Sequence, residues 1–518
     1  MDKSTEKLTK EERPLANIFF LLFFLISLLN LGFNFLGSPA VKFIYLGQVI
    51  LVFFSLFLGK RENYIWIFIL FSIFEGQGRI LWSYNPFFRL VFDIFLALMV
   101  VKELTRTKKI LDREIIPKYL IILILIHLIW FFIEVFNPMG PDIFTSLATS
   151  KYYIFPLFLF FLFKSTRFDF SDPHFQKNLQ DCLLIIFLVS GLVVFQTFQG
   201  EEHLFGISMN YLNLQPKFLK FIGNNFRPWG TSFIYGGMGT LFYCSVALIL
   251  LYNPKTIYRQ KHIKVVAGKV FKWGGLGLLF YASFLGQVRS ATLKTAGIVL
   301  LFFAFKFLGS RVKARLAITL LMSSLVLGGG VYFSSGDSYV AQSSYSDGEV
   351  NKAVERWEGM LDGNISSHRA GLDIFLDTLS NKVEFPLGYG LGMTQSFLPG
   401  FEQRRRQLPN IHPTTFWHLD NLIVFLFLEI GIGAFFYLAI IGAVLISLFS
   451  RMFTLLKWQE MTAFTVLTAC CSSTLVIVFF NWGAVSLPFN PESFYFWLWS
   501  ALGFSTFYFT KKRRRERI

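Results

Sequence analysis

Residues 16–34 read ANIFFLLFFLISLLNLGFN and contain no aspartate, glutamate, lysine or arginine. A bilayer helix needs about 20 consecutive apolar residues, so this stretch has the length and character of a membrane-spanning helix. Comparable apolar runs recur along the rest of the chain. This recurrence indicates a polytopic membrane protein.

The composition excludes most soluble classes. The chain has 518 residues, of which 54% are hydrophobic and 16% are charged, whereas a soluble domain has about 25% charged residues. A cytosolic enzyme, a secreted disulfide scaffold and a disordered chain are therefore excluded. Because all four cysteines lie inside apolar runs, neither a disulfide framework nor a zinc site is expected.

The apolar runs predict an all-α polytopic membrane protein with about 14 transmembrane helices and one large periplasmic loop. Residues 1–333 hold helices 1–11, residues 334–416 form the large loop, and residues 417–518 hold helices 12–14 and a basic cytoplasmic tail. The predicted spans are 16–34, 41–58, 64–75, 86–101, 117–136, 144–163, 181–198, 231–252, 273–287, 291–308, 316–333, 419–449, 462–481 and 490–509.

The distribution of lysine and arginine predicts the orientation. Fourteen spans place both termini on one side, whose loops hold 32 of the 49 basic residues, against 13 in the opposite loops. Cytoplasmic loops carry the positive excess, so both termini are predicted to be cytoplasmic. This topology explains the net charge of +17, and no nucleic-acid partner is implied. The first run has no small-residue cleavage site and is expected to remain as an uncleaved span.

Basic residues gather at the predicted outer ends of the spans. Arg227 and Arg289 lie in outer segments beside spans, and Lys151 lies about 10 Å inside its span by the helical rise. Arg356 and Arg369 lie in the large loop. A charge within a span is costly unless it is paired or solvated, and guanidinium groups match phosphate oxygens. These five residues are predicted to bind a lipid diphosphate.

A second polar group lies where span 12 begins. His412, His418 and Asp420 lie at the mouth of the span, where His418 or Asp420 is a candidate general base toward a hydroxyl. Glu429 lies 2.5 turns deeper and is interpreted either as a functional group or as the acceptor of a structural interhelical hydrogen bond.

Other polar residues within the spans have simpler interpretations. Lys294 and Lys306 lie near span ends and are expected to extend to the membrane surface. His127 and Glu134 lie seven residues apart on one helical face and are interpreted as a polar pair. The glycine-spaced stretch FPLGYGLG (385–392) is interpreted as a tight turn.

The sequence motifs of several enzyme classes are absent from the chain. DxD, HExxH, P-loop and GxSxG patterns are absent, so nucleotide-sugar, zinc-protease, ATPase and hydrolase activities have no support. No metal and no cofactor are predicted.

The order of four segments resembles one family. The segments are FRPWGTS (226–232), QVRSAT (287–292), HRAGLDIFLDTLSNKVEFPLGYGLGM (368–393) and HLDNLIVFLFLEIGIGAFF (418–436). Together they resemble the O-antigen ligase and Wzy-type O-antigen polymerase superfamily over roughly residues 144–450.

The resemblance implies a metal-independent glycosyltransferase of the bacterial inner membrane. The donor would be an undecaprenyl-diphosphate-linked glycan, and the acceptor would be a glycan or lipid A core. Membrane lipids would surround the protein. A chain-length regulator protein is a further candidate partner. Single displacement at the anomeric carbon, with inversion, is the implied reaction.

The resemblance also assigns roles to residues. By position, Arg227, Arg289 and Arg369 match the family's diphosphate-binding arginines, and Glu429 with Gly431 matches its Glu-x-Gly.

One departure concerns the general base. Many members of the family have His-Asn nine residues before the Glu-x-Gly glutamate, where this chain has Asp420 and Asn421. Asp420, His418 and His412 therefore remain alternative bases. The Asp-Asn pair favours the polymerase branch over the ligase branch.

Two alternatives to a polymerase remain at this point. A ligase would transfer the finished glycan to lipid A core or to a protein and would share the donor site. A lipid-linked oligosaccharide flippase or another transporter would show two matching halves with broken helices. No such symmetry is visible in the sequence.

Overall fold

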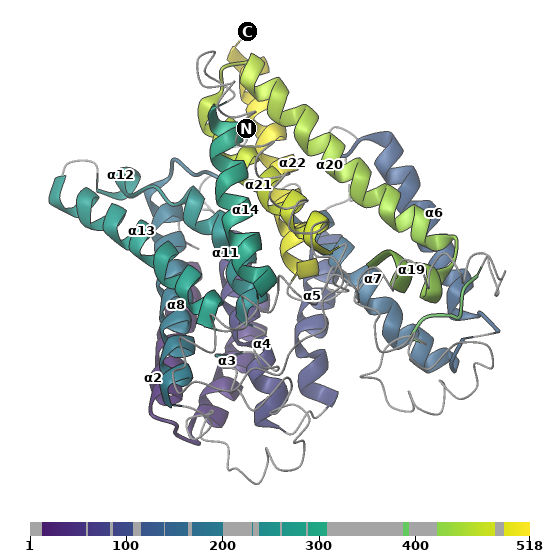
Figure 1. Cartoon of the computed structure of the whole chain (residues 1–518), viewed down its shortest axis with the longest axis horizontal. Coiled ribbons are helices and arrows are strands. Elements are labelled where there is room, and N and C mark those ends of the chain that lie inside the picture. The colour runs from purple at the N-terminus through teal and green to yellow at the C-terminus, as the bar shows by residue number, and fades with distance from the viewer. Residues whose placement is uncertain are drawn as a thin grey trace, which may run out of the picture. The chain divides into compact units, whose positions relative to one another are not determined.

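The structure is a computed structural model. It describes residues 13–58, 61–82, 86–106, 115–138, 140–163, 168–199, 230–231, 238–258, 262–285, 289–307, 387–392, 422–481 and 492–517. Within these residues every regular element is a helix and there is no strand (Figure 1). The predicted all-α class is confirmed for the described part of the chain.

Each predicted span that the structure describes overlaps a helix, although the bounds of several differ. Span 316–333 and nearly all of the loop 334–416 lie outside the described residues, so the count of 14 spans and the periplasmic loop remain predictions. The helices are α2 (Arg13–Phe35), α3 (Val41–Leu58), α4 (Arg61–Leu81), α5 (Pro86–Arg106), α6 (Lys118–Val135), α7 (Ile143–Phe163), α8 (Pro173–Gln199), α11 (Met238–Leu251), α12 (Pro254–Ile257), α13 (His262–Leu285), α14 (Arg289–Phe307), α19 (Leu422–Ile430), α20 (Gly433–Lys457), α21 (Met461–Asn481) and α22 (Glu492–Arg517).

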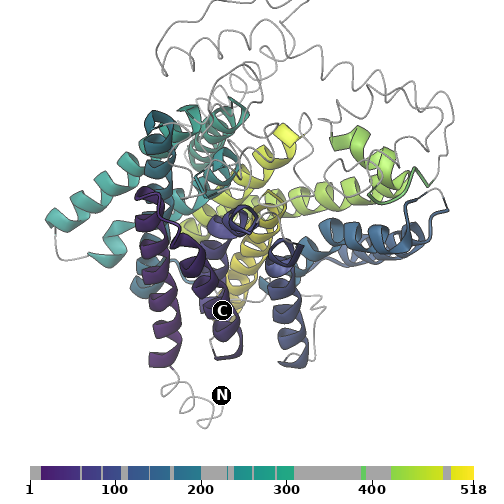
Figure 2. The ribbon, with the colours of Figure 1, turned by 90° about the horizontal axis from the view of Figure 1, so that it is seen from below.

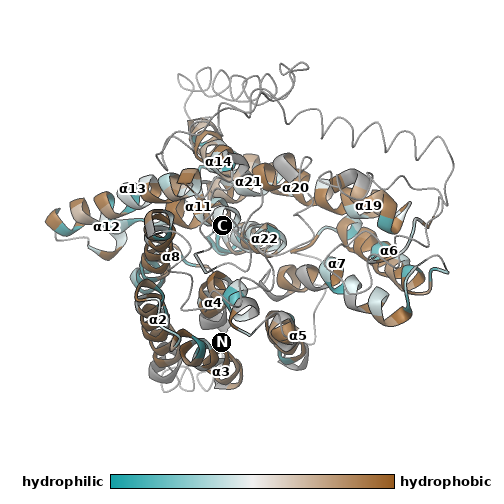
Figure 3. Cartoon of the chain, turned by 60° about the horizontal axis from the view of Figure 1, so that its bottom comes forward, coloured by the Kyte–Doolittle hydropathy of each residue, from teal (hydrophilic) through white to brown (hydrophobic). Residues whose placement is uncertain are grey.

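Length and composition indicate a membrane protein. Six helical segments among the described residues are long and apolar enough to cross a bilayer: Ile18–Phe35, Lys118–Val135, Ile143–Phe161, Pro173–Phe198, Gly433–Lys457 and Met461–Phe479. A helix satisfies its own backbone N–H and C=O groups by hydrogen bonds, whereas lipid offers these groups no partner. Large apolar side chains such as Phe43 and Phe144 are 78% and 84% exposed, as expected of lipid-facing positions. Figure 3 shows apolar residues along most of α2 and α8.

Two predicted spans differ from the helices. The apolar run 419–449 is not one span: it is divided into α19 and α20 by Gly431, whose φ of 50° a helix cannot continue through. The run 273–287 is the second half of a longer helix, α13, which begins at His262. Lys272 lies on that helix, and its ammonium caps the end of α11 by donating to the carbonyl oxygens of Leu250 at 2.9 Å and Tyr252 at 2.8 Å.

The chain forms two compact units that do not follow sequence order. Unit 1 holds the described residues within Met1–Arg106 and Phe168–Ala296. Unit 2 holds those within Thr107–Arg167, Gly297–Ser343 and Trp357–Ile518.

In unit 1, α2, α3 and α4 are joined by a buried chain of amide side chains. Asn30 donates to Gln48 at 2.9 Å, Asn34 donates to Asn30 at 2.6 Å, and Gln77 donates to Asn34 at 3.0 Å. Gln48 donates in turn to Ser27 at 3.1 Å. All five side chains are fully buried, so these bonds fix the register of the three helices within apolar surroundings.

In unit 2, α6 and α20 lie side by side, as both Figure 1 and Figure 2 show. Tyr119 of α6 and Ser447 of α20 are 2.5 Å apart through their hydroxyls. Near the other end of the pair, the indole of Trp130 donates to the carbonyl oxygen of Ile430 at 3.0 Å. Helix α6 is thus bonded to α20 near one end and to the last residue of α19 near the other.

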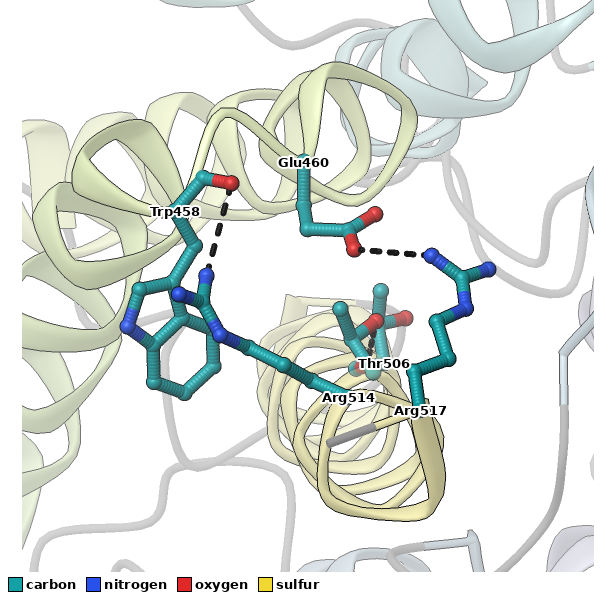
Figure 4. A network of polar contacts seen from close by, with 6 residues as sticks. Trp458, Glu460, Thr506, Arg514 and Arg517 are labelled. Carbon is teal, nitrogen blue, oxygen red and sulfur yellow. Dashed lines mark hydrogen bonds and ion pairs between the residues drawn. The ribbon is translucent and has the colours of Figure 1, made fainter.

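The basic C-terminal segment continues α22 as helix to Arg517. Figure 4 shows Arg514 and Arg517 against the connection between α20 and α21. Arg514 donates to the carbonyl oxygen of Trp458 at 3.5 Å and stacks 5.0 Å from the centre of its ring. Arg517 pairs with Glu460 at 3.7 Å, but both side chains are partly exposed, so this pair contributes little to stability.

Candidate functional site

The structure describes only part of the predicted site. Lys151 and Glu429 have described side chains, and Arg289 is described as the first residue of α14 without its side chain. The remaining predicted residues lie outside the described residues: Arg227, Arg356, Arg369, His412, His418, Asp420 and Asn421.

Glu429 joins three segments of unit 2. Its carboxylate accepts from the hydroxyl of Tyr153 on α7 at 2.6 Å and from the backbone N–H of Gly392 at 3.1 Å. The side chain is fully buried. The interpretation of Glu429 as the acceptor of an interhelical hydrogen bond is confirmed.

The stretch Leu387–Gly392 is the tight turn that its glycines predict, and it caps α19. Gly388 and Gly390 have φ values of 71° and 89°, which favour glycine. Tyr389 donates its N–H to the carbonyl oxygen of Leu428 at 2.7 Å, and Gly390 donates to that of Glu429 at 3.0 Å. We call this turn, together with the end of α19, the clasp.

The clasp completes the backbone pairing of a broken helix. The last four carbonyl groups of a helix lack partners within it. At the end of α19, the carbonyl oxygen of Phe427 accepts from the N–H of Gly431. Those of Leu428 and Glu429 accept from the turn, and that of Ile430 accepts from the indole of Trp130. Because lipid offers no partners, these bonds allow the chain to break between α19 and α20.

A second carboxyl group lies against the clasp. Asn137 follows α6 and donates to Glu134 at 2.9 Å; the same amide lies 3.3 Å from the carbonyl oxygen of Gly388. Glu134 is fully buried, and its other oxygen has no hydrogen-bond partner among the described residues. The clasp is therefore bonded to α6 as well as to α7.

The predicted pair of His127 and Glu134 does not form. Both are buried on one face of α6, but Glu134 bonds Asn137 instead. His127 packs 4.6 Å from Phe131 and 5.5 Å from Tyr437 between ring centres, and its nitrogens have no partner among the described residues. Two helical turns separate the two side chains along the axis, which is too far for a direct bond.

Lys151 lies on the helix that contacts the clasp. It is half-buried, eight residues after the start of α7 and two before Tyr153, and its ammonium lies 5.0 Å from the centre of the Tyr152 ring. At the start of α7, the hydroxyl and N–H of Thr145 donate to Asp142 and lower the pKa of that carboxyl group. The depth of Lys151 within a membrane stays a prediction.

In unit 1, Gly230 and Thr231 of the FRPWGTS stretch are held by buried contacts. Gln196 of α8 accepts from the N–H of Gly230 at 2.8 Å, and Thr231 donates to the carbonyl oxygen of Ile73 at 2.5 Å. Both residues are buried. This segment of FRPWGTS is therefore fixed against α8 and α4.

Lys294 does not extend to the surface, contrary to expectation. Its side chain is 3% exposed, and its ammonium lies 4.5 Å from the centre of the Tyr243 ring and 3.4 Å from the Tyr243 hydroxyl. The aromatic ring of α11 attracts the cation inward, so the lysine lies in the interior of unit 1. A lysine inside an otherwise apolar helix was the only sequence signal for this position.

The sequence analysis missed Asn137 and Tyr153 as parts of the site, and it read Glu134 only as a pair with His127. Asn137 and Tyr153 are common residue types without a motif, and their partners are more than 240 residues away. Among the described residues no group of three or more histidine, cysteine, aspartate or glutamate side chains could hold a metal ion.

Neither models of protein families, nor curated proteins, nor solved structures give a match to this chain. The functional conclusion therefore depends on the chain's own residues and contacts.

A substitution at Glu429 tests the clasp. Glu429→Gln replaces one acceptor oxygen with a donor, so either Tyr153 or Gly392 loses its partner, at a cost of about 1–2 kcal/mol. Thermal unfolding of the purified chain in detergent measures the loss. Glu460→Gln is the control, because this carboxylate makes a partly exposed ion pair and should change little. Equal unfolding temperatures for both variants would contradict the role of Glu429.

Proposed function

We propose that this chain is a membrane glycosyltransferase that polymerises undecaprenyl-diphosphate-linked oligosaccharide repeat units into a surface polysaccharide, such as O-antigen, capsule or exopolysaccharide. One observation carries the proposal. The two segments that bear much of the resemblance, the Gly-rich turn and the Glu-x-Gly, form a single hydrogen-bonded unit although about 40 residues separate them.

In the proposed function, the clasp tethers the two loops that carry the reacting groups. Leu387 follows Arg369 by 18 residues, and His412 follows Gly392 by 20. The loop that carries the proposed diphosphate ligand and the loop that carries the candidate bases are therefore both tethered to α6, α7 and α19. Such tethering limits the loss of entropy when the two groups come together on a substrate.

The proposed reaction is a single displacement. The acceptor hydroxyl oxygen attacks the anomeric carbon, a new glycosidic bond forms, and the bond from that carbon to the diphosphate oxygen breaks. The leaving lipid diphosphate takes the electron pair, and Arg227, Arg289 and Arg369 stabilise its charge with Lys151 and Arg356 in support. His418, Asp420 or His412 accepts the hydroxyl proton.

The membrane setting agrees with a lipid-linked donor. The helices indicate a membrane protein, so a donor anchored by a polyprenyl chain reaches the site by diffusion within the bilayer. The proposal places the protein in the bacterial inner membrane with both termini in the cytoplasm. This orientation puts the basic end of α22 in the cytoplasm, and cytoplasmic segments of membrane proteins carry an excess of lysine and arginine.

A flippase for lipid-linked oligosaccharide is the second candidate, because α19 and α20 form a broken helix. Transporters use such breaks to build binding sites. In this chain, however, the carbonyl groups at the end of α19 are occupied by the clasp and by Trp130. That pairing favours a structural role for the break over the coordination of a transported ion.

Glycan length in a strain that lacks the gene tests the proposal. A polymerase predicts acceptors that carry one repeat unit and no long chains. Long lipid-linked chains that never reach an acceptor would identify a ligase. Repeat units that accumulate on the cytoplasmic side would identify a flippase, and unchanged surface glycan would exclude all three functions.

A further inference from the structure

The first turns of α13, His262–Trp273, expose large apolar side chains. We call this stretch the basic segment, because it also carries three lysines. Its exposed apolar residues are Ile263, Val266, Val270 and Trp273, which are 84%, 46%, 66% and 47% exposed. Spacings of three and four residues place these four side chains on one face of the helix. Helix α13 is nevertheless not among the six described segments that are apolar enough to cross a bilayer.

The opposite face of α13 is packed against unit 1. A Cβ at Gly268 would lie 2.4 Å from the Cβ of Pro254 in α12, and Figure 1 shows α12 beside the beginning of α13. A Cβ at Gly275 would lie 2.0 Å from the ring of Phe187 in α8. Glycines at such positions let two helices approach closely, so they fix which side of α13 faces its neighbours. The apolar face therefore points away from α8 and α12.

The exposed apolar face continues along α13 beyond the basic segment. Tyr281 lies 18 residues after Ile263, or about five complete turns, so both side chains lie on the same side of the helix. Tyr281 is 41% exposed, and its neighbour Phe280 is 36% exposed. This half of α13 overlaps the predicted span 273–287, where an exposed apolar face is expected to meet lipid. Continuity with that half favours lipid, rather than a protein partner, as the cover of the basic segment.

Cationic side chains flank the apolar face. Lys264 and Lys269 are exposed and lie on opposite sides of it, and Lys255 of the neighbouring α12 is exposed as well. No aspartate or glutamate occurs between Glu202 and Asp337, so α11–α14 carry no acidic side chain that could neutralise these lysines. Anionic phospholipids attract lysines that lie near a membrane surface. The charge of this surface is therefore complementary to anionic headgroups.

Trp273 lies between the basic and the apolar part of α13. No charged residue follows it before the helix ends at Leu285. Tryptophan concentrates at the boundary between headgroups and hydrocarbon. His262 is about 16 Å from Trp273 by the helical rise, whereas the headgroup layer on one side of a bilayer is only about 5–8 Å thick. A perpendicular helix would thus place Ile263 in water, and a helix inclined toward the membrane surface would not.

We infer that the basic segment lies along the membrane surface, within the headgroup layer, and binds anionic phospholipids through Lys264 and Lys269. Its apolar face meets the acyl chains, while the lysine ammonium groups extend to the phosphates. The loop between the predicted spans on either side of this segment is expected to be cytoplasmic, so the lipids are those of the cytoplasmic leaflet. The inference goes beyond the proposed function and does not depend on the reaction.

A fluorescent probe on Val266→Cys in the full-length chain tests the inference. The four native cysteines are buried, so the introduced thiol is labelled in preference to them. The labelled chain is reconstituted in phosphatidylcholine vesicles that contain a nitroxide quencher on either phosphatidylglycerol or phosphatidylcholine. Both lipids should quench the probe, phosphatidylglycerol about fivefold more strongly, and aqueous iodide should quench it weakly. Val270→Cys is the second probe position if the Val266 variant does not fold.

Neutral variants separate the lysines from the apolar face. Lys264→Gln combined with Lys269→Gln should bring the two lipids to equal quenching, and the unfolding temperature should not change because both side chains are exposed. Lys118→Gln combined with Lys457→Gln is the matched control, because these two exposed lysines belong to unit 2. The control should keep the preference for phosphatidylglycerol.

Three results would overturn the inference. Strong quenching by iodide and none by lipid would place the basic segment in water. Quenching by neither would mean that protein, such as a second copy of the chain, covers the apolar face. Equal quenching by the two lipids in the wild type would leave contact with hydrocarbon but no anionic lipid site. None of these readouts involves turnover, so each is separable from the test of the polymerase.

Discussion

Replacement of Arg227 by alanine is expected to abolish polymer formation while the amount of folded protein stays the same. Removal of one charged donor from a group that stabilises a leaving anion lowers the rate by about a hundredfold or more. The fold should survive, because the bonds that fix this stretch are made by Gly230 and Thr231. Glycan length in a deletion strain that carries the variant measures the effect, and immunoblotting measures the protein.

Arg517→Ala is the matched control for Arg227→Ala. Arg517 lies near the C-terminus, and its pairing with Glu460 is partly exposed. Its loss should leave both the amount of protein and the glycan unchanged. Arg369→Ala should reproduce the Arg227→Ala phenotype. Wild-type polymer in both Arg227→Ala and Arg369→Ala would refute the diphosphate role of these arginines.

Replacement of Gly388 by alanine is expected to break the clasp and cost about 2–5 kcal/mol. Alanine at a φ of 71° is strained by about 1–2 kcal/mol. The added Cβ would also lie 2.8 Å from the backbone nitrogen of Gly431 and 2.8 Å from the carbonyl oxygen of Leu428, which are not free to move. Overpacking of this kind costs about 1–3 kcal/mol further.

Thermal unfolding and limited proteolysis measure the effect of Gly388→Ala. The variant should unfold at a lower temperature, and the chain around residue 390 should be cleaved faster than in the wild type. Gly442→Ala is the control, because Gly442 is in α20 and has no atom near the position of the added Cβ. That variant should be as stable as the wild type or slightly more stable. Equal stability of the Gly388 and Gly442 variants would contradict the clasp.

The helices could be predicted from the sequence because lipid imposes a simple rule. A spanning segment must be apolar and must pair its own backbone groups, so α3 and α21 lie within a residue of their predicted bounds. The break at Gly431 was missed because the run around it stays apolar on both sides. A hydropathy pattern carries no information on the backbone conformation of a single residue, such as the positive φ of Gly431.

The contacts of the site could be predicted only in part. Glycine spacing predicts the turn at 387–392 from local geometry alone, and its interhelical partner Glu429 stands out as a charge in an apolar run. Asn137 and Tyr153 gave no such signal, because only the packing of α6 and α7 brings them to the clasp. The inward direction of Lys294 depends on Tyr243, which lies 51 residues earlier in the chain.

Turnover of a defined donor tests the central claim most directly. The purified chain is reconstituted in vesicles with an undecaprenyl-diphosphate-linked repeat unit, and free undecaprenyl diphosphate and glycan length are measured together. A polymerase predicts that one lipid diphosphate is released for each repeat unit added. A donor that stays intact, or that crosses the bilayer without release of its lipid, would contradict a glycosyltransferase that acts on a polyprenyl diphosphate.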